Sequence, residues 1–191
     1  MELALYAPGL GYYSGGATKL GKDGDFTTAP EISPLFGASL AQFAIPLLAQ
    51  SKPQMMEFCA GSGQLAHDIL TELARCGVTL EKYFIVELSG QLRARQQQKL
   101  EAFPQVEWLD ALPATFDGVI VGNEVLDAMP VQLVQKDADG QGWQEMGVIC
   151  STDAEGHSQF GWQTQPASAA IMAQLQAQIP QAESLAPGYL T

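Results

Sequence analysis

The chain has 191 residues, of which 47% are hydrophobic and 16% are charged, and its formal net charge is −12. This apolar content can fill a core and excludes a disordered chain, and no apolar run approaches the ~18 residues that a membrane-spanning helix needs. The negative charge repels phosphate groups, so we do not expect nucleic acid as a partner. We also expect no membrane insertion, and we predict a soluble cytoplasmic protein. Three cysteines without a Cys-x-x-Cys pair favour a reducing compartment and predict neither disulfides nor a metal site.

The first 130 residues predict an ordered N-terminal segment followed by an α/β core. Residues 1–33 alternate glycines with aromatic side chains, which is typical of a packed loop or lid. A helix is expected from Pro34, with Ser33 as its cap, and Pro46 should kink or end it. Residues 34–130 then alternate apolar runs with helical patterns, which indicates a doubly wound sheet of parallel strands. The expected strands are 55–60, 83–88, 106–109 and 116–122.

The pattern changes to antiparallel strands after Pro130. Residues 131–165 are predicted to form an inserted hairpin or meander, because Asp-Ala-Asp-Gly and Asp-Ala-Glu-Gly turns separate its apolar runs. Residues 166–191 supply a final helix and a tail. Only four parallel strands are accounted for, so we expect an incomplete sheet and an N-terminal portion of a longer protein.

The segment Gly61-Ser62-Gly63 joins the first expected strand to a helix. Such a turn brings bare backbone close to a ligand at a helix N-terminus and fits the loose dinucleotide-binding pattern, whereas the Walker pattern is absent. Glu87 ends the second strand, where a carboxylate can accept hydrogen bonds from both ribose hydroxyls. Asp110 follows the third strand, where it can receive the amine of adenine. Together these residues predict a nucleoside site.

Glu57 favours S-adenosylmethionine as that nucleoside. An acid early in the first strand is awkward in a dinucleotide site, but it can bind the ammonium group of S-adenosylmethionine directly or through water. A nicotinamide-dependent oxidoreductase is the alternative enzyme, supported by the loose glycine pattern alone. A non-catalytic assembly or binding module is the alternative outside enzymes.

The fourth expected strand ends in Asn123 and Glu124, followed by Asp127. Two carboxylates and an amide suit a cationic group with several donors, such as guanidinium, and the two acids share a face if the segment is helical. Residues 101–191 hold 12 acidic side chains and one basic side chain, a field that favours a cationic substrate. Val125 and Leu126 stand where nucleobase amino-methylases carry an aromatic group, which disfavours a nucleobase substrate.

In combination, these motifs resemble the MidA-type family, whose mitochondrial members assist assembly of respiratory complex I. The matching segments are Gly11-Tyr12-Tyr13-Ser14, residues 24–33, Phe36-Gly37, residues 57–63, Val86-Glu87-Leu88-Ser89, Asn123-Glu124, Asp127-Ala128 and Pro130-Val131. The resemblance implies a Rossmann-like class I methyltransferase that uses S-adenosylmethionine. It also implies an accessible arginine in a protein, such as a complex I subunit, as the acceptor. Eukaryotic members of the family lie in the mitochondrial matrix.

The site residues follow from the motifs and the resemblance together. The expected cofactor-binding residues are Glu57, Cys59, Ala60, Gly61, Gly63, Glu87, Leu88, Asp110 and Ala111. The expected catalytic residues are Glu124, Asp127 and Asn123, and the expected lid residues are Asp25, Phe26, Thr27, Pro30 and Glu31. Cys59 replaces the first glycine of the family's Glu-x-Gly-x-Gly-x-Gly turn, a change that is tolerated if this position has dihedral angles ordinary for an L-residue.

Overall fold

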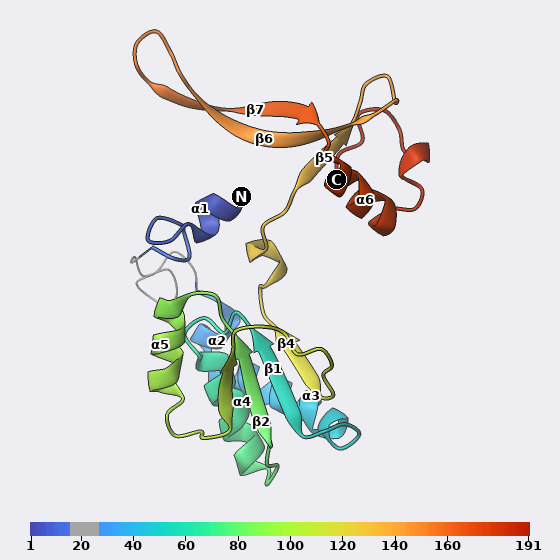
Figure 1. Cartoon of the computed structure of the whole chain (residues 1–191). Coiled ribbons are helices and arrows are strands. Elements are labelled where there is room, and N and C mark those ends of the chain that lie inside the picture. Colours follow the sequence, from blue (N-terminus) through green and yellow to red (C-terminus); the bar gives the residue numbers. More distant parts are fainter. Residues whose placement is uncertain (16–26) are drawn as a thin grey trace. The chain divides into compact units, whose positions relative to one another are not determined.

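Four parallel strands form the sheet of residues 2–129 (Figure 1). They are β1 (Gln54–Phe58), β2 (Lys82–Val86), β3 (Val106–Leu109) and β4 (Val119–Gly122), in the spatial order β3-β2-β1-β4. The sheet extends from one side of β1 through β2 and β3, and β4 pairs with the other side of β1. The order therefore reverses between β1 and β4, and open α/β sheets bind ligands beyond the carboxyl ends of their strands at such a reversal. The mainly parallel sheet expected from the sequence is confirmed.

The computed structural model describes residues 1–15 and 27–191. These residues form two compact units, residues 2–129 and residues 130–191 with Met1. None of the helices in the described residues is long and apolar enough to cross a membrane.

Three longer helices accompany the parallel sheet: α3 (Pro34–Leu48), α4 (Gln64–Arg75) and α5 (Gly90–Lys99). Serine side chains cap two of them, because Ser33 accepts a hydrogen bond from the backbone N–H of Leu35 and Ser89 accepts one from that of Leu92. Pro46 does not end α3 at once, and the helix continues to Leu48. Because proline has no backbone N–H, the carbonyl of Gln42 lacks its helical partner, but this is a single lost hydrogen bond in the last turn of the helix.

Two short helices, α1 (Glu2–Tyr6) and α2 (Ala29–Ile32), lie in the N-terminal segment where the sequence predicted a loop. Pro30 falls in the first turn of α2, where its fixed φ suits a helix and its missing N–H is not needed.

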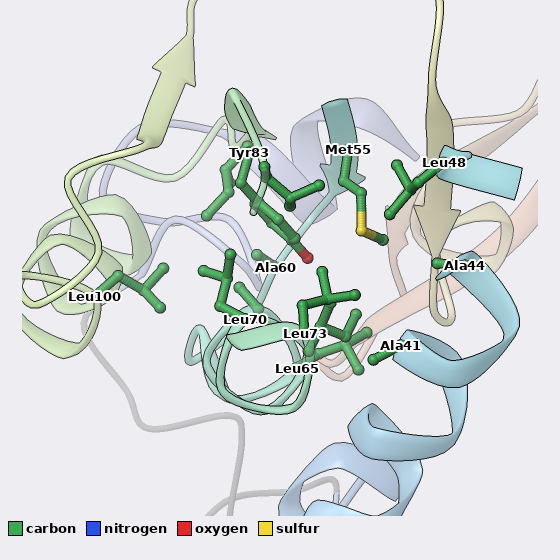
Figure 2. Close-up of a cluster of buried hydrophobic side chains, with 14 residues drawn as sticks. Ala41, Ala44, Leu48, Met55, Ala60, Leu65, Leu70, Leu73, Tyr83 and Leu100 are labelled. Atoms are coloured by element: carbon green, nitrogen blue, oxygen red, sulfur yellow. The ribbon is translucent and has the colours of Figure 1, made fainter. Parts of the chain in front are cut away.

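The core of the larger unit lies between the sheet and helices α3 and α4 (Figure 2). Figure 2 shows the Tyr83 ring of β2 among aliphatic side chains of β1, α3 and α4. Gly37 lets α3 approach α4 closely, since a Cβ at this position would lie 2.6 Å from the Cβ of Asp68. This packing fixes the helix that begins at the glycine turn against the rest of the fold.

The smaller unit contains an antiparallel sheet in the order β5-β6-β7. Its elements are β5 (Leu133–Lys136), β6 (Trp143–Thr152), β7 (Ser158–Pro166) and α6 (Ala169–Gln178), with the 3-10 helix η2 (Ala182–Ser184) near the end of the chain. The expected meander is therefore present as a three-stranded sheet. Its own core contains Val134, Trp143, Ile171 and Leu175.

Candidate functional site

A pocket in the larger unit lies at the carboxyl ends of β1, β2 and β4. Its lining includes Tyr6, Tyr13, Thr28, Pro30, Glu31, Glu57, Cys59, Ala60, Gly61, Ser62, Gln64, Glu87, Leu88, Leu92, Asn123, Glu124, Asp127 and Ala128. The pocket therefore occupies the reversal of strand order, where the fold predicts a ligand site.

The glycine turn between β1 and α4 adopts left-handed backbone conformations. The φ angles are 54° at Gly61 and 82° at Gly63, values that glycine reaches without steric cost. Gly63 does not line the pocket but packs against Gln96, because a Cβ on Gly63 would lie 3.4 Å from the Cα of that residue. Glycine at this position brings the turn close to α5.

Cys59 has a φ of 52°, so the condition under which the sequence predicts that a thiol is tolerated at this position is not met. A non-glycine residue in the left-handed region costs about 1–2 kcal/mol. Burial, reinforced by the nearby Glu87 and Glu57, raises the pKa of the Cys59 thiol to about 11. The side chain that faces the pocket at neutral pH is therefore a neutral thiol.

Glu57 at the end of β1 is 2% exposed and accepts a hydrogen bond from the Tyr83 hydroxyl at 2.7 Å. Burial raises the pKa of Glu57 to about 7, and the negative charge of Glu87 acts in the same direction. The hydrogen bond from Tyr83 opposes this shift because it stabilises the carboxylate. Glu57 is thus a buried acid that a cation in the pocket would ionise.

Glu87, just beyond β2, has both of its carboxylate oxygens held. The backbone N–H of Ser89 donates to Oε1 at 2.9 Å, and the side-chain amide of Gln96 donates to Oε2 at 3.0 Å. Burial raises the pKa of Glu87 against these hydrogen bonds. Each carboxylate oxygen retains acceptor capacity, which suits the binding of hydroxyl groups.

The chain beyond β4 brings Asn123, Glu124 and Asp127 to the same pocket. Glu124 has a φ of 53°, and the helical turn that follows is the short 3-10 helix η1 (Leu126–Ala128). The two acids therefore lie near each other through a sharp turn rather than on one helical face. Strained backbone at a non-glycine residue is typical of functional sites.

Two tyrosines of the N-terminal segment line the pocket, although they are not among the site residues expected from the sequence. Tyr6 donates a hydrogen bond to the carbonyl of Ala128 at 2.7 Å, and its ring stacks on that of Tyr13 at 5.6 Å between centroids. The Gly-Tyr-Tyr-Ser motif contains Tyr13 and was the sequence feature that could have identified Tyr13 as a site residue. No local pattern links Tyr6 to a residue more than a hundred positions away.

The expected lid and adenine residues fall into three groups. Pro30 and Glu31 line the pocket, and the Ser62 hydroxyl of the glycine turn donates to the Glu31 carboxylate. Thr27, Asp110 and Ala111 are not among the lining residues, and Asp110 pairs with Arg93 at 2.5 Å. Asp25 and Phe26 lie outside the described residues.

The pocket is strongly acidic. Five carboxylates line it, from Glu31, Glu57, Glu87, Glu124 and Asp127, and its described lining contains no lysine, arginine or histidine. Burial raises the pKa of Tyr6 and of Tyr13, and the nearby acidic groups add to both shifts. This electrostatic environment suits a cationic occupant and disfavours phosphate.

A mainly parallel α/β sheet with a glycine turn at its strand reversal is shared by class I methyltransferases and dinucleotide-binding proteins, and the family match assigns this chain to the methyltransferases. The chain belongs to the family described as "Putative S-adenosyl-L-methionine-dependent methyltransferase", whose model matches residues 39–191. The family expected from the sequence motifs is confirmed.

Curated relatives include the mitochondrial protein arginine methyltransferase NDUFAF7 homolog of Caenorhabditis elegans and NDUFAF7 of Xenopus laevis. The first is 28% identical over 183 residues, covering 81% of this chain and 42% of the relative. The second is 30% identical over 177 residues, covering 76% and 40%. A Burkholderia thailandensis protein, solved bound to S-adenosyl-homocysteine, is 51% identical with a TM-score of 0.74, covering 93% of this chain and 47% of that one. The chain thus spans less than half the length of these relatives.

Proposed function

We propose that this chain binds S-adenosylmethionine at the glycine turn and forms the cofactor-binding part of a methyltransferase. The observation that carries the proposal is the acidic pocket, with five carboxylates around the end of β1 and no basic side chain in its described lining. S-adenosylmethionine carries a sulfonium and an ammonium group, both cationic, which such a pocket stabilises. The pyrophosphate of a nicotinamide dinucleotide would be repelled.

The residues fit the parts of this molecule in the order of the strands. Glu57 and the turn at Gly61 bind the methionine end, and Glu87 accepts hydrogen bonds from the ribose hydroxyls. Gly63 contributes by letting this turn pack on α5. Asp110 remains the predicted partner of the adenine amine, although it pairs with Arg93 outside the pocket lining. The Burkholderia thailandensis protein bound to S-adenosyl-homocysteine supports the choice of ligand.

The acceptor that the site suits best is an arginine in a protein. When bound, S-adenosylmethionine would supply a methyl group to an attacking nitrogen, with S-adenosylhomocysteine as the leaving group and a proton released from the nitrogen. The chain contributes Glu124 and Asp127, whose carboxylates can hold a guanidinium by charge-assisted hydrogen bonds, and Asn123, which lines the cleft beside them. The names of the curated relatives, protein arginine methyltransferases, support this acceptor. A cytoplasmic location stays a prediction.

A thermal-shift measurement on the full chain tests the cofactor and separates the alternatives. S-adenosylmethionine and S-adenosylhomocysteine, each at about 100 times its Kd, should add about 2.7 kcal/mol of stability and raise the Tm by several degrees. NAD should have no effect. A shift with NAD alone would indicate an oxidoreductase, and no shift with any of the three would indicate a non-catalytic module.

Transfer of tritium from labelled S-adenosylmethionine tests the acceptor. The chain, and in parallel the full-length Burkholderia thailandensis relative, is incubated with lysate of a strain that lacks the corresponding gene, and the labelled product is hydrolysed. We expect methylarginine, and we expect Glu124→Gln to lose transfer while it still binds S-adenosylhomocysteine. Label on a nucleobase, a carboxylate or a small metabolite, with none on arginine, would exclude this acceptor.

A further inference from the structure

Gln96 of α5 is a polar side chain with no exposed surface. Its amide makes three hydrogen bonds to three separate parts of the fold. The Nε2 atom donates to the carbonyl of Gly61 at 2.9 Å and to Oε2 of Glu87 at 3.0 Å. The Oε1 atom accepts from the indole N–H of Trp108 on β3 at 2.9 Å.

Chemistry fixes which way this amide faces. An indole N–H can only donate, so the oxygen of Gln96 must face Trp108. A backbone carbonyl and a carboxylate can only accept, so the two N–H groups must face Gly61 and Glu87. Turning the amide over would place an acceptor against two acceptors and a donor against a donor. The three partners therefore hold Gln96 in a single orientation.

The same residue also sets the distance between the glycine turn and α5. A Cβ on Gly63 would lie 3.4 Å from both the Cα and the Cγ of Gln96, so the turn rests directly on this side chain. One end of the pocket, at Gly61, and another, at Glu87, are thus joined by one buried amide. A movement of Gln96 would therefore change the contacts of any ligand that binds both Gly61 and Glu87.

We propose that Gln96 is a positioning residue that aligns the ribose-binding carboxylate of Glu87 with the glycine turn, so that both bind one ligand together. The inference rests on the proposed function, because it assigns S-adenosylmethionine to this pocket. Gln96 does not line the pocket and acts only through Glu87 and Gly61. No sequence motif marks it, since it is the first of three consecutive glutamines in a helix.

Those neighbours provide matched controls for mutagenesis. Gln97 is on the same helix but exposed, so identical substitutions at position 97 change composition without touching the pocket. Gln96→Met keeps the length of the side chain and removes both donors. Gln96→Glu keeps the shape and replaces the amide nitrogen with an oxygen that donates only when protonated.

Calorimetric titration with S-adenosylhomocysteine across a pH series is the measurement. Gln96→Met should weaken binding roughly tenfold, as expected for losing a hydrogen bond to a charged group. Because that hydrogen bond lowers the pKa of Glu87, its loss should also move the acid limb of the affinity profile to higher pH.

In Gln96→Glu, the affinity for S-adenosylhomocysteine should change with pH in the opposite direction to that in Gln96→Met. Protonated, the new acid can still donate to Glu87 and accept from Trp108, so affinity approaches that of the wild type at low pH. Ionised, it places two carboxylates against each other, so affinity falls as the pH rises. Among the described residues, Glu57, Cys59 and Tyr6 are the other titratable groups that interact with Glu87. All variants contain these three groups, so their effect on the pH dependence of binding is the same in each.

The outcomes separate this inference from the function on which it rests. If the wild type does not bind S-adenosylhomocysteine, the proposed function fails. If the wild type binds, but both position-96 variants bind equally well or lose the same factor at every pH, Gln96 is a structural core residue and the inference fails. If Gln96→Met does not fold, the comparison of Gln96→Glu with Gln97→Glu tests the inference by itself, through the change of binding affinity with pH in each variant.

Discussion

At the scale of single residues, Cys59 stands in a backbone conformation that favours glycine. Its φ of 52° carries a steric cost of about 1–2 kcal/mol, whereas glycine loses about 0.5–1 kcal/mol in chain entropy on folding. Cys59→Gly should therefore leave the free energy of unfolding unchanged or raise it by up to about 1.5 kcal/mol.

Urea unfolding of two variants checks this expectation. Cys76 has an ordinary φ of −84° at the end of α4, and its thiol accepts a hydrogen bond from Gln42 and donates one to Glu72. Cys76→Gly therefore relieves no backbone strain, loses these contacts together with chain entropy, and should be destabilised. If both cysteine-to-glycine variants lose the same free energy, the left-handed conformation of Cys59 carries no strain. A β-branched Cys59→Val variant should be the least stable of the set.

The buried acid Glu57 gives the protein a characteristic pH dependence. Its pKa is about 7 in the folded state against 4.5 for an unperturbed glutamate, so between these two values the folded state binds the proton and the unfolded state has lost it. Stability contributed by this group is fully present below about pH 4.5 and declines as the pH rises to about 7.

The comparison with Glu57→Gln isolates this contribution, because glutamine does not titrate. We expect the free energy of unfolding of the wild type, relative to Glu57→Gln, to fall between about pH 4.5 and 7. Urea titrations at several pH values measure the difference. A difference that is flat, or that rises with pH, would mean that Glu57 is ionised in the folded protein.

At the scale of elements, the contact between α3 and α4 holds the helix that follows the glycine turn. A Cβ at Gly37 would lie 2.6 Å from the Cβ of Asp68 and 3.3 Å from the backbone nitrogen of Ile69. Gly37→Ala should therefore force the helices apart and destabilise the fold by about 1–3 kcal/mol, the range for overpacking.

Gly90 at the start of α5 is the matched control, since a Cβ there meets no atom within 4 Å. Gly90→Ala should be neutral or slightly stabilising, because alanine has the higher helix propensity. Thermal melting of both variants distinguishes local crowding from a general effect of replacing glycine. An unchanged Tm for Gly37→Ala would show that α3 can shift without loss.

The elements themselves could largely be predicted from the sequence, for identifiable reasons. Apolar runs separated by amphipathic segments specify parallel strands with intervening helices, and acidic turns specify the antiparallel strands. The end of α3 was less well predicted, because the helix continues for two residues beyond Pro46. The effect of a proline depends on how near the helix end it lies. The glycine turn, Glu57 and Glu87 were found because strand ends and short motifs are local features.

The rest of the pocket depends on contacts between distant segments, which no local pattern records. Tyr6 contacts Ala128, and Gln96 contacts both Gly61 and Glu87, through hydrogen bonds between segments that are far apart in the sequence. Asp110 shows the converse: a strand-end acid in a suitable position pairs with Arg93 instead of lining the pocket. The position of a residue at a strand end thus predicts that it lies near the site. Whether its side chain lines the pocket depends on which neighbouring side chains bind it.

For the chain as a whole, we propose that the acidic pocket binds S-adenosylmethionine through Glu87 and the glycine turn. Isothermal titration calorimetry with S-adenosylhomocysteine on the wild type, Glu87→Gln and the control Glu81→Gln tests it most directly, since Glu81 is exposed. We predict one site in the wild type and in the control, and a loss of about 1.5–3 kcal/mol in Glu87→Gln, as expected for hydrogen bonds to a charged group. Equal affinity in all three proteins, or no binding to the wild type, would contradict the claim.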